Sequence, residues 1–175
     1  MIVFKQTNEV LYREAIVSLY IDCFSTGVSE QYIDLAELTE YIGLVLDKGN
    51  AVLSFENELM TGAVLSLPLK YDSYLPEIIS RDFIVNNCIY IAELMVTQQK
   101  RGKGTGEKLL SEFIKNVDRN FYTGIFIRVW DQNFPALRLY QKMGFVPVAT
   151  IRQTKKHADG NGTFDMNKIY LYKAV

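Results

Sequence analysis

Apolar and polar positions along the chain recur with two periods, which separate predicted strands from predicted helices. Short runs rich in β-branched and aromatic residues are typical of strands. Longer segments whose apolar residues recur three and four positions apart are typical of helices with one buried face. The predicted strands are 2–6, 51–55, 60–67, 89–96, 125–130, 146–151 and 163–172, and the predicted helices run from 7 or 8 to 24, from 29 to 46, from about 104, and from about 133.

In chain order these elements read β-α-α-β-β-β-α-β-α-β-β, which predicts the α/β class with a mixed sheet. Residues 56–58 and 159–162 have turn composition, so each is predicted to close a hairpin. The stretch 68–87 is longer than most connections, and it is interpreted either as a functional lid or as a surface excursion with a short helix at 76–83. With no repeat or linker, residues 1–175 are predicted to form a single domain.

A glycine-rich segment joins the strand 89–96 to the helix that follows it. Its sequence is Gln99-Lys100-Arg101-Gly102-Lys103-Gly104-Thr105-Gly106. The alternating glycines lack the Cβ atoms that would hold a ligand away from the backbone. Backbone N–H groups at a helix start bind anions, and three basic side chains add positive charge at the same place. The segment therefore predicts a site for a phosphorylated cofactor.

Two common phosphate-binding patterns do not fit this segment. A P-loop needs a Gly-Lys pair followed by Ser or Thr, which is missing here. A dinucleotide fingerprint needs a third glycine where Glu107 stands, and it usually opens the first βαβ unit of a domain. The pattern Gln-x-x-Gly-x-Gly, by contrast, is met in full by Gln99, Gly102 and Gly104.

A second patterned segment, residues 124–145, follows one helix later. Asp131 or Asn133 is predicted to cap its helix, and Pro135 fits the first turn. The fixed positions of Asn-x-x-Ala-x-x-x-Tyr-x-x-x-Gly-Phe are all present, at Asn133, Ala136, Tyr140, Gly144 and Phe145. Together with Gln-x-x-Gly-x-Gly, in this order, the pattern resembles the GNAT superfamily of N-acetyltransferases over about residues 88–151.

The resemblance implies a GNAT fold with a splayed, mostly antiparallel sheet, and acetyl-CoA as the cofactor. The loop would hold the pyrophosphate, and the strand 94–96 would pair with the pantetheine arm and offer a backbone N–H near Met95 to the thioester carbonyl. The implied cofactor-binding residues are Leu94, Met95, Val96, Gln99, Lys100, Arg101, Gly102, Lys103, Gly104, Thr105, Gly106, Asn133 and Tyr140.

Tyr140 is the candidate general acid. The resemblance implies that its hydroxyl lies near the cofactor sulfur, where a phenol can protonate the leaving thiolate. A core tyrosine on an apolar helix face is the alternative. Asn133 lies seven residues earlier on the same face, and a helix cap and a cofactor contact are compatible roles for it.

Glu93 is the candidate general base, because an acceptor amine must lose a proton before it attacks. A carboxylate inside the apolar strand 89–96 is costly unless it has a function or a partner. The alternative is a salt bridge, with Arg128 on the neighbouring strand as a candidate partner. Glu30 and Asp34 remain open as other acids near the substrate.

Composition limits the remaining possibilities. The net charge is −1, so no broad nucleic-acid interface is expected. Cys23 and Cys88 are predicted to be core residues, and the single His157 argues against a metal site. No membrane span and no signal peptide are predicted, so a cytoplasmic protein is expected.

Together with these features, the GNAT resemblance implies an acetyl-CoA-dependent N-acetyltransferase whose acceptor is a primary amine of a small molecule or peptide. No Ser-His-Asp or Cys-His set is evident, which favours direct attack in a ternary complex. The alternatives are a protein N-terminal or lysine acetyltransferase and a non-catalytic acyl-CoA-binding module. The resemblance makes a homodimer possible, and the acceptor itself is not encoded in any motif.

Overall fold

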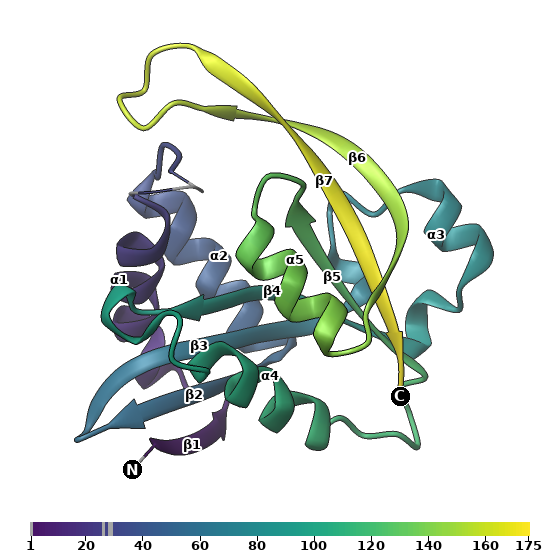
Figure 1. Cartoon of the computed structure of the whole chain (residues 1–175), viewed down its shortest axis with the longest axis horizontal. Coiled ribbons are helices and arrows are strands. Elements are labelled where there is room, and N and C mark those ends of the chain that lie inside the picture. Colours follow the sequence, from purple (N-terminus) through teal and green to yellow (C-terminus); the bar gives the residue numbers. More distant parts are fainter. Residues whose placement is uncertain (1, 26, 28–29) are drawn as a thin grey trace.

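A computed structural model describes residues 2–25, 27 and 30–175. The structure is a mixed sheet of seven strands in the order β1-β2-β3-β4-β5-β7-β6 (Figure 1). All neighbouring strands are antiparallel except β4 and β5. The strands are β1 (Ile2–Thr7), β2 (Asn50–Glu56), β3 (Leu59–Pro68), β4 (Cys88–Val96), β5 (Gly124–Trp130), β6 (Val146–Lys156) and β7 (Thr163–Ala174).

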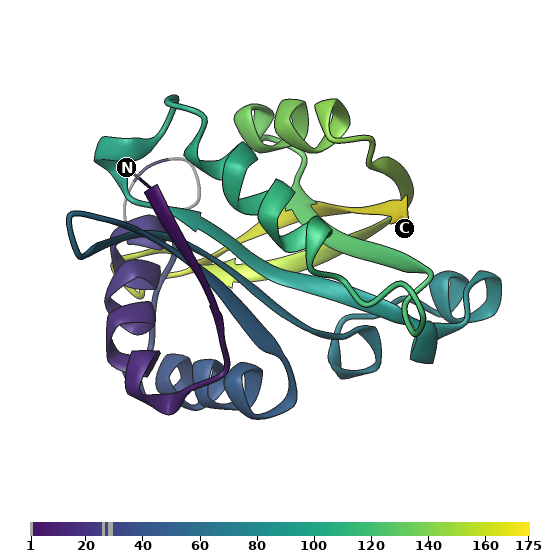
Figure 2. The same cartoon turned by 90° about the horizontal axis from the view of Figure 1, so that it is seen from below.

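Helices cover both faces of the sheet (Figure 2). They are α1 (Arg13–Phe24), α2 (Leu35–Lys48), α3 (Glu77–Asp82), α4 (Thr105–Lys115) and α5 (Phe134–Lys142). Side chains of α1, α2 and the segment 69–83 pack on one face around Phe126 and Tyr170. Side chains of α4 and α5 pack on the other face around Ile91 and Ile127. The period-2 alternation of each strand thus supplies two separate cores.

The α/β class and the predicted order of elements are confirmed, with the short helix α3 added between β3 and β4. The sheet is mixed, mostly antiparallel, and splayed between β4 and β5. The hairpin at 56–58 turns through Asn57 and Glu58, both at positive φ. Cys23 and Cys88 are buried free thiols, as predicted. Asn133 caps α5 by accepting a hydrogen bond from Ala136 N at 3.3 Å.

Several predicted boundaries were wrong. The first α-helix begins at Arg13 rather than after Thr7 or Asn8, because Thr7 still belongs to β1. The Thr7 hydroxyl accepts a hydrogen bond from Glu9 N, and a short 3-10 helix, Val10–Tyr12, then precedes α1. The predicted start of the second helix at Ser29 lies outside the described residues, and α2 begins only at Leu35. Its cap is Asp34, which accepts from Ala36 N and Glu37 N at 2.9 and 3.0 Å.

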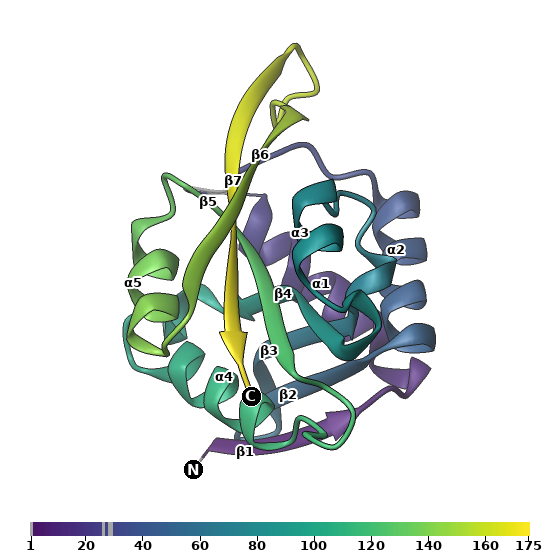
Figure 3. The ribbon, with the colours of Figure 1, turned by 90° about the vertical axis from the view of Figure 1, so that its right-hand side faces the viewer.

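The last hairpin is longer than predicted. Strand β6 continues to Lys156, and the β6–β7 pair extends past the rest of the molecule (Figure 3). Its outer part is attached to the chain before α2, since the Lys156 carbonyl accepts from Tyr32 N at 3.1 Å. Residues 152–156 are all polar, including the buried Gln153, so no apolar residue at alternate positions marks this part of the chain as a strand.

The stretch 68–87 is packed against the sheet. Leu69 and Ile79 are fully buried in the core under α1 and α2, and Phe83 packs edge to face against Phe126, with ring centroids 5.0 Å apart. It contains the short helix α3, which favours the excursion over the lid. Within the described chain, no helix is both long and apolar enough to cross a membrane.

Candidate active site

The cleft of the molecule opens where β4 and β5 separate. The two strands pair only from Cys88 with Gly124 to Ile91 with Ile127. Beyond that point 92–96 and 128–130 continue without pairing to each other. The edge of β4 that faces β5 is therefore free of sheet hydrogen bonds over its last five residues.

Leu94 and Val96 direct their backbone groups into this cleft. Thr97 N donates to Thr61 O at 3.0 Å, which sets the phase of the antiparallel β3–β4 ladder. Because alternate residues of such a ladder bond the partner strand, Met95 also faces β3, and Leu94 and Val96 face away from it. Consistently, the Val96 carbonyl accepts from Arg101 Nε at 3.0 Å.

A cavity of about 450 Å³ occupies the cleft. It is bounded by the end of β4, the glycine-rich segment, one face of α5 and the end of α1. Most of the predicted cofactor-binding residues line it: Leu94, Met95, Val96, Arg101, Gly102, Gly104, Thr105, Gly106, Asn133 and Tyr140. The two predicted motifs, about thirty residues apart in the chain, thus meet in one cavity.

Three predicted residues do not line this cavity. Lys100 forms a salt bridge with Glu56 of the β2–β3 hairpin. Gln99 and Lys103 are exposed on the outer side of the segment. Arg101 is the basic side chain of this segment that borders the cavity.

The glycine-rich segment fits a phosphate group. Gly102 and Gly104 have φ of +71° and +79°, and a Cβ on either would meet nothing within 4 Å, so open space adjoins the backbone. Gly104 is the N-terminal cap of α4, and none of the described side chains caps this helix. The first N–H groups of α4 are consequently available to an anion.

A smaller inner cavity, about 160 Å³, adjoins the cleft. Tyr140, Asn133, Leu94, Ala136 and Phe24 line both spaces. Tyr140 is only 5% exposed. Burial, together with the nearby Glu93 carboxylate, raises the pKa of its phenol, which keeps the hydroxyl protonated near neutral pH.

Glu93 lies on the inner side of Tyr140. In the β3–β4 ladder Leu65 pairs with Glu93 and Ser66 with Ile91, so Ala92 is an extra residue in β4. Such an irregularity re-aims the next side chain, and the Glu93 side chain accepts from the Tyr41 hydroxyl of α2 at 3.1 Å. Burial raises the pKa of the Glu93 carboxyl to about 7, although Tyr41 and nearby cations oppose the shift.

The alternative role of Glu93, a salt bridge to Arg128, was wrong. Arg128 instead donates to Asp72 at 3.1 Å and to the Tyr170 hydroxyl at 2.8 Å. Tyr170 in turn donates to Asp72 at 2.7 Å. Glu93 therefore keeps a carboxylate whose described partner is a neutral tyrosine.

An outer cavity of about 310 Å³ continues from Glu93 between α2 and the segment after β3. It is lined by six tyrosines: Tyr20, Tyr32, Tyr41, Tyr71, Tyr74 and Tyr90. Asp34 borders this space, but its carboxylate caps α2. Glu30 lies elsewhere, beside Trp130 and His157 in a depression near the hairpin tip.

Sequence reasoning missed Tyr41, Lys155 and Lys168 as site residues. Lys168 lines the inner cavity, and Lys155 lines both the inner and outer cavities. A signal for Lys168 was present, since on β7 it alternates with the buried Met166 and Tyr170. A lysine among the inward-facing, alternate residues of a strand is unusual and marks a candidate functional site.

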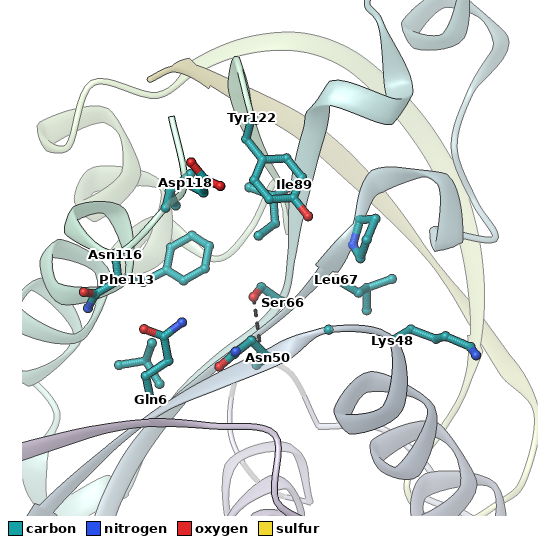
Figure 4. A pocket seen from close by; sticks show the side chains of 14 residues that line it. Gln6, Lys48, Asn50, Ser66, Leu67, Ile89, Phe113, Asn116, Asp118 and Tyr122 are labelled. Atoms are coloured by element: carbon teal, nitrogen blue, oxygen red, sulfur yellow. Dashed lines mark hydrogen bonds between the residues drawn. The ribbon is translucent and has the colours of Figure 1, made fainter. Parts of the chain in front are cut away.

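A fourth space is separate from these cavities (Figure 4). It measures about 250 Å³ and lies near the start of β4, with Ile89, Phe113 and Tyr122 around it. Neither Glu93 nor Tyr140 lines it. Asn50 Oδ1, also at this space, is buried and has no hydrogen-bond partner among the described residues.

Acidic, histidine and cysteine side chains do not gather into a metal site in the part of the chain that the structure describes. His157 packs near Phe164, with ring centroids 5.0 Å apart.

The sequence profile of the acetyltransferase (GNAT) family matches residues 13–145, more than two thirds of the chain. The chain belongs to the GNAT acetyltransferase family. The match spans both motifs and most of the residues that border the cleft.

Solved structures resemble this GNAT protein over nearly their whole length. A ribosomal-protein-alanine N-acetyltransferase from Brucella melitensis has a TM-score of 0.72 at 15% identity, with 99% of each chain covered. The yncA protein from Salmonella typhimurium, solved with acetyl-CoA, has a TM-score of 0.70 at 18% identity, covering 99% of this chain and 94% of its own. NAA60 from Arabidopsis thaliana, in complex with a bisubstrate analogue, has a TM-score of 0.70 at 18% identity, covering 99% and 98%.

At these identities the likeness concerns the fold alone. Among curated proteins, none matches the sequence of this chain. The acceptor must therefore be argued from the cavities themselves.

Proposed function

We propose that this chain transfers the acetyl group of acetyl-CoA to a primary amine of a small molecule or peptide by direct attack in a ternary complex. The observation that carries this proposal is the junction at Tyr140. On one side of Tyr140 lies the cleft, with a glycine-rich segment suited to phosphate binding. On the other side lies the inner cavity, with the Glu93 carboxyl, whose pKa is raised to about 7.

The cleft residues would hold the cofactor. The N–H groups at the start of α4 and the Arg101 side chain would bind phosphate, and the free edge of β4 would pair with the pantetheine arm. Acetyl-CoA would supply a thioester whose carbon accepts the amine nitrogen. An N–H donor to the thioester oxygen is assigned to Leu94 or Val96 rather than Met95, because Met95 faces β3.

Two side chains would transfer protons, Glu93 as the general base and Tyr140 as the general acid. Glu93, with a pKa of about 7, would accept a proton from the incoming ammonium directly or through water. As the C–N bond forms and the C–S bond breaks, the Tyr140 hydroxyl would donate a proton to the leaving sulfur. The second proton, which the nitrogen loses as it becomes an amide, would return to Tyr140 directly or through water. The raised pKa of Tyr140 means that its proton is present to be donated.

Thermal unfolding with and without acetyl-CoA tests the cofactor site. A ligand at a hundred times its Kd adds about 2.7 kcal/mol to stability, so a clear rise in Tm is expected. ADP at the same concentration is the control for phosphate binding alone. An unchanged Tm at millimolar acetyl-CoA would contradict the proposal.

Thiol release from acetyl-CoA with a panel of amines and peptides then tests the reaction. Release that depends on an amine is the expected result. A clear Tm shift without release for any acceptor would instead favour the non-catalytic acyl-CoA-binding module.

A further inference from the structure

The inner cavity contains more positive than negative charge. Its ionisable lining is Arg128, Lys155 and Lys168 against the single acid Glu93, apart from the tyrosines. The residues outside the described ranges are Met1, Thr26, Val28 and Ser29, and none of them has an ionisable side chain. The excess of positive charge in the inner cavity is therefore not altered by the residues outside the described ranges.

The strand register brings the cations together. Lys168 of β7 pairs with Trp130, and Tyr170 pairs with Arg128, so Lys168 and Arg128 occupy neighbouring positions on one face of the sheet. Gln153 of β6 pairs with Met166, which puts Lys155, two residues on, along the same face. This face looks into the cavity opposite Glu93 of β4.

Only one of the three cations is neutralised. Arg128 is 14% exposed at its side chain and is paired with Asp72, which is 2% exposed. Lys155 and Lys168 make no salt bridge within the described part of the chain. Burial lowers the pKa of the Lys168 amine to about 8, Lys155 and Arg128 lower it further, and Glu93 opposes them.

We infer that the acceptor carries a carboxylate beside its primary amine, as in a free amino acid. Lys168 and Lys155 bind the carboxylate, and Glu93 faces the amine. This inference rests on the proposed function and narrows its acceptor from any amine to a small zwitterion. A cavity with two unpaired lysines and one acid is neutralised by an anionic group better than by a second cation.

A polycationic acceptor fits the site less well. In the outer cavity, Asp34 is used as the cap of α2 and Asp72 is held by Arg128. Only the exposed Glu37 remains there to meet a second ammonium group. A peptide acceptor has an amide in place of the carboxylate, which leaves both lysines unpaired in the complex.

Matched acceptors test the inference directly. The acceptors are L-alanine, L-leucine, L-phenylalanine and L-glutamine, each beside its carboxamide and one alanyl dipeptide. For the preferred side chain, KM for the free amino acid is expected to be about 10- to 100-fold below that of its carboxamide, the range of a charge-assisted contact. Equal or lower KM values for the carboxamides or the dipeptide would overturn the inference.

Substitutions of the two lysines test whether they bind the carboxylate of the acceptor. Lys168→Gln and Lys155→Gln are expected to raise KM for the amino acid about tenfold or more and to change KM for its carboxamide less than about twofold. Lys115→Gln, whose side chain is 76% exposed on α4, is the control and should leave both values unchanged. An equal rise for both acceptors would indicate a structural role for the lysines and would also overturn the inference.

A binding measurement separates this inference from the proposed function. Calorimetry of the same acceptors is carried out on the full chain saturated with CoA, so no turnover is needed. Tighter binding of the amino acid than of its carboxamide, lost in Lys168→Gln, is expected. If CoA binds but no amino acid binds more tightly than its carboxamide, the acceptor class is wrong. Failure of CoA itself to bind would contradict the cofactor site instead.

Discussion

Glu93 shows how one extra residue in a strand sets the chemistry of a side chain. Without the irregularity at Ala92, regular alternation would carry Glu93 away from the face on which Tyr41 and the lysines lie. The same position partly buries the carboxylate between the inner and outer cavities, and this burial raises its pKa. A base with a pKa of about 7 is half deprotonated near neutral pH and still accepts a proton effectively.

Glu93→Gln should remove the ascending limb of the pH profile. In the wild type, kcat/KM is expected to rise through about pH 7 as the carboxyl deprotonates. In the variant, kcat/KM at pH 8 should fall about 100-fold or more, with no inflection near pH 7. A variant that keeps the wild-type profile would exclude Glu93 as the base.

The same variant should be more stable than the wild type at high pH. The folded state raises the pKa of Glu93, so it binds that proton more tightly than the unfolded chain does, and stability is lost as pH rises through about 7. Gln cannot ionise and still accepts from Tyr41. In urea unfolding, the free energy of unfolding of the variant should therefore exceed that of the wild type by an amount that grows from pH 5 to pH 8, reaching on the order of 1–3 kcal/mol.

Tyr140→Phe should lower turnover and leave the cofactor site intact. The change removes one hydroxyl from a buried ring that packs near Phe145, so kcat should fall about 100-fold while acetyl-CoA affinity stays within about twofold. Steady-state kinetics and calorimetry measure the two quantities. Tyr122→Phe, at the separate space near β4, is the matched control. A wild-type kcat in Tyr140→Phe would remove Tyr140 as the acid.

Residues fixed by local motifs could be predicted from the sequence, and residues fixed by distant partners could not. Asn133, Gly104 and Tyr140 belong to short patterns whose spacing encodes a cap, a turn and a helix face, and all three line the cleft. The partner of Glu93 is Tyr41, 52 residues away, which no local pattern encodes. The alternative contact between Glu93 and Arg128 was wrong for the same reason, because the partner of Arg128 is Asp72, from the irregular stretch after β3.

At the level of strands and helices, the order followed from periodicity, while several boundaries depended on tertiary contacts. The start of α2 is set by the Asp34 cap rather than by the onset of apolar spacing. The outer part of β6 is polar and forms a strand because β7 pairs with it as far as Lys156. Hairpin pairing here outweighs composition.

Gly104→Tyr should abolish acetyl-CoA binding, because the loop between β4 and α4 works through its backbone. A side chain at this position enters the open space beside the N–H groups of α4, and it must also adopt a φ of +79° that only glycine adopts readily. Calorimetry is expected to show at least about a hundredfold loss of affinity, the effect of blocking the phosphate site.

The control is Gly160→Tyr in the last hairpin turn, which has a similar φ of +77° outside the cleft. It carries the same backbone strain and should bind acetyl-CoA as the wild type does. Unchanged affinity in Gly104→Tyr would place the cofactor elsewhere.

Across the whole molecule, the two halves of the sheet are joined by only a short stretch of strand pairing. The first half, β1 to β4, meets β5 through only four residue pairs before the strands separate. On the face covered by α1 and α2, Asp72 of the connection after β3 also bonds Arg128 of β5 and Tyr170 of β7. This cluster connects the two halves of the sheet beside the inner cavity. It therefore stabilises the arrangement in which β4 and β5 separate to form the cleft.

Asp72→Ala should therefore destabilise the fold much more than a matched surface change. It leaves the Arg128 guanidinium buried without its counter-charge, which costs about 3 kcal/mol or more when a buried pair is broken. Asp82→Ala removes an equivalent pair with Arg81, but those side chains are 47% and 70% exposed, so its effect should stay below about 0.5 kcal/mol. Urea unfolding of both variants measures the difference. Equal losses would mean that the Asp72 cluster does not hold the two halves together, and that the four β4–β5 pairs with the two cores suffice.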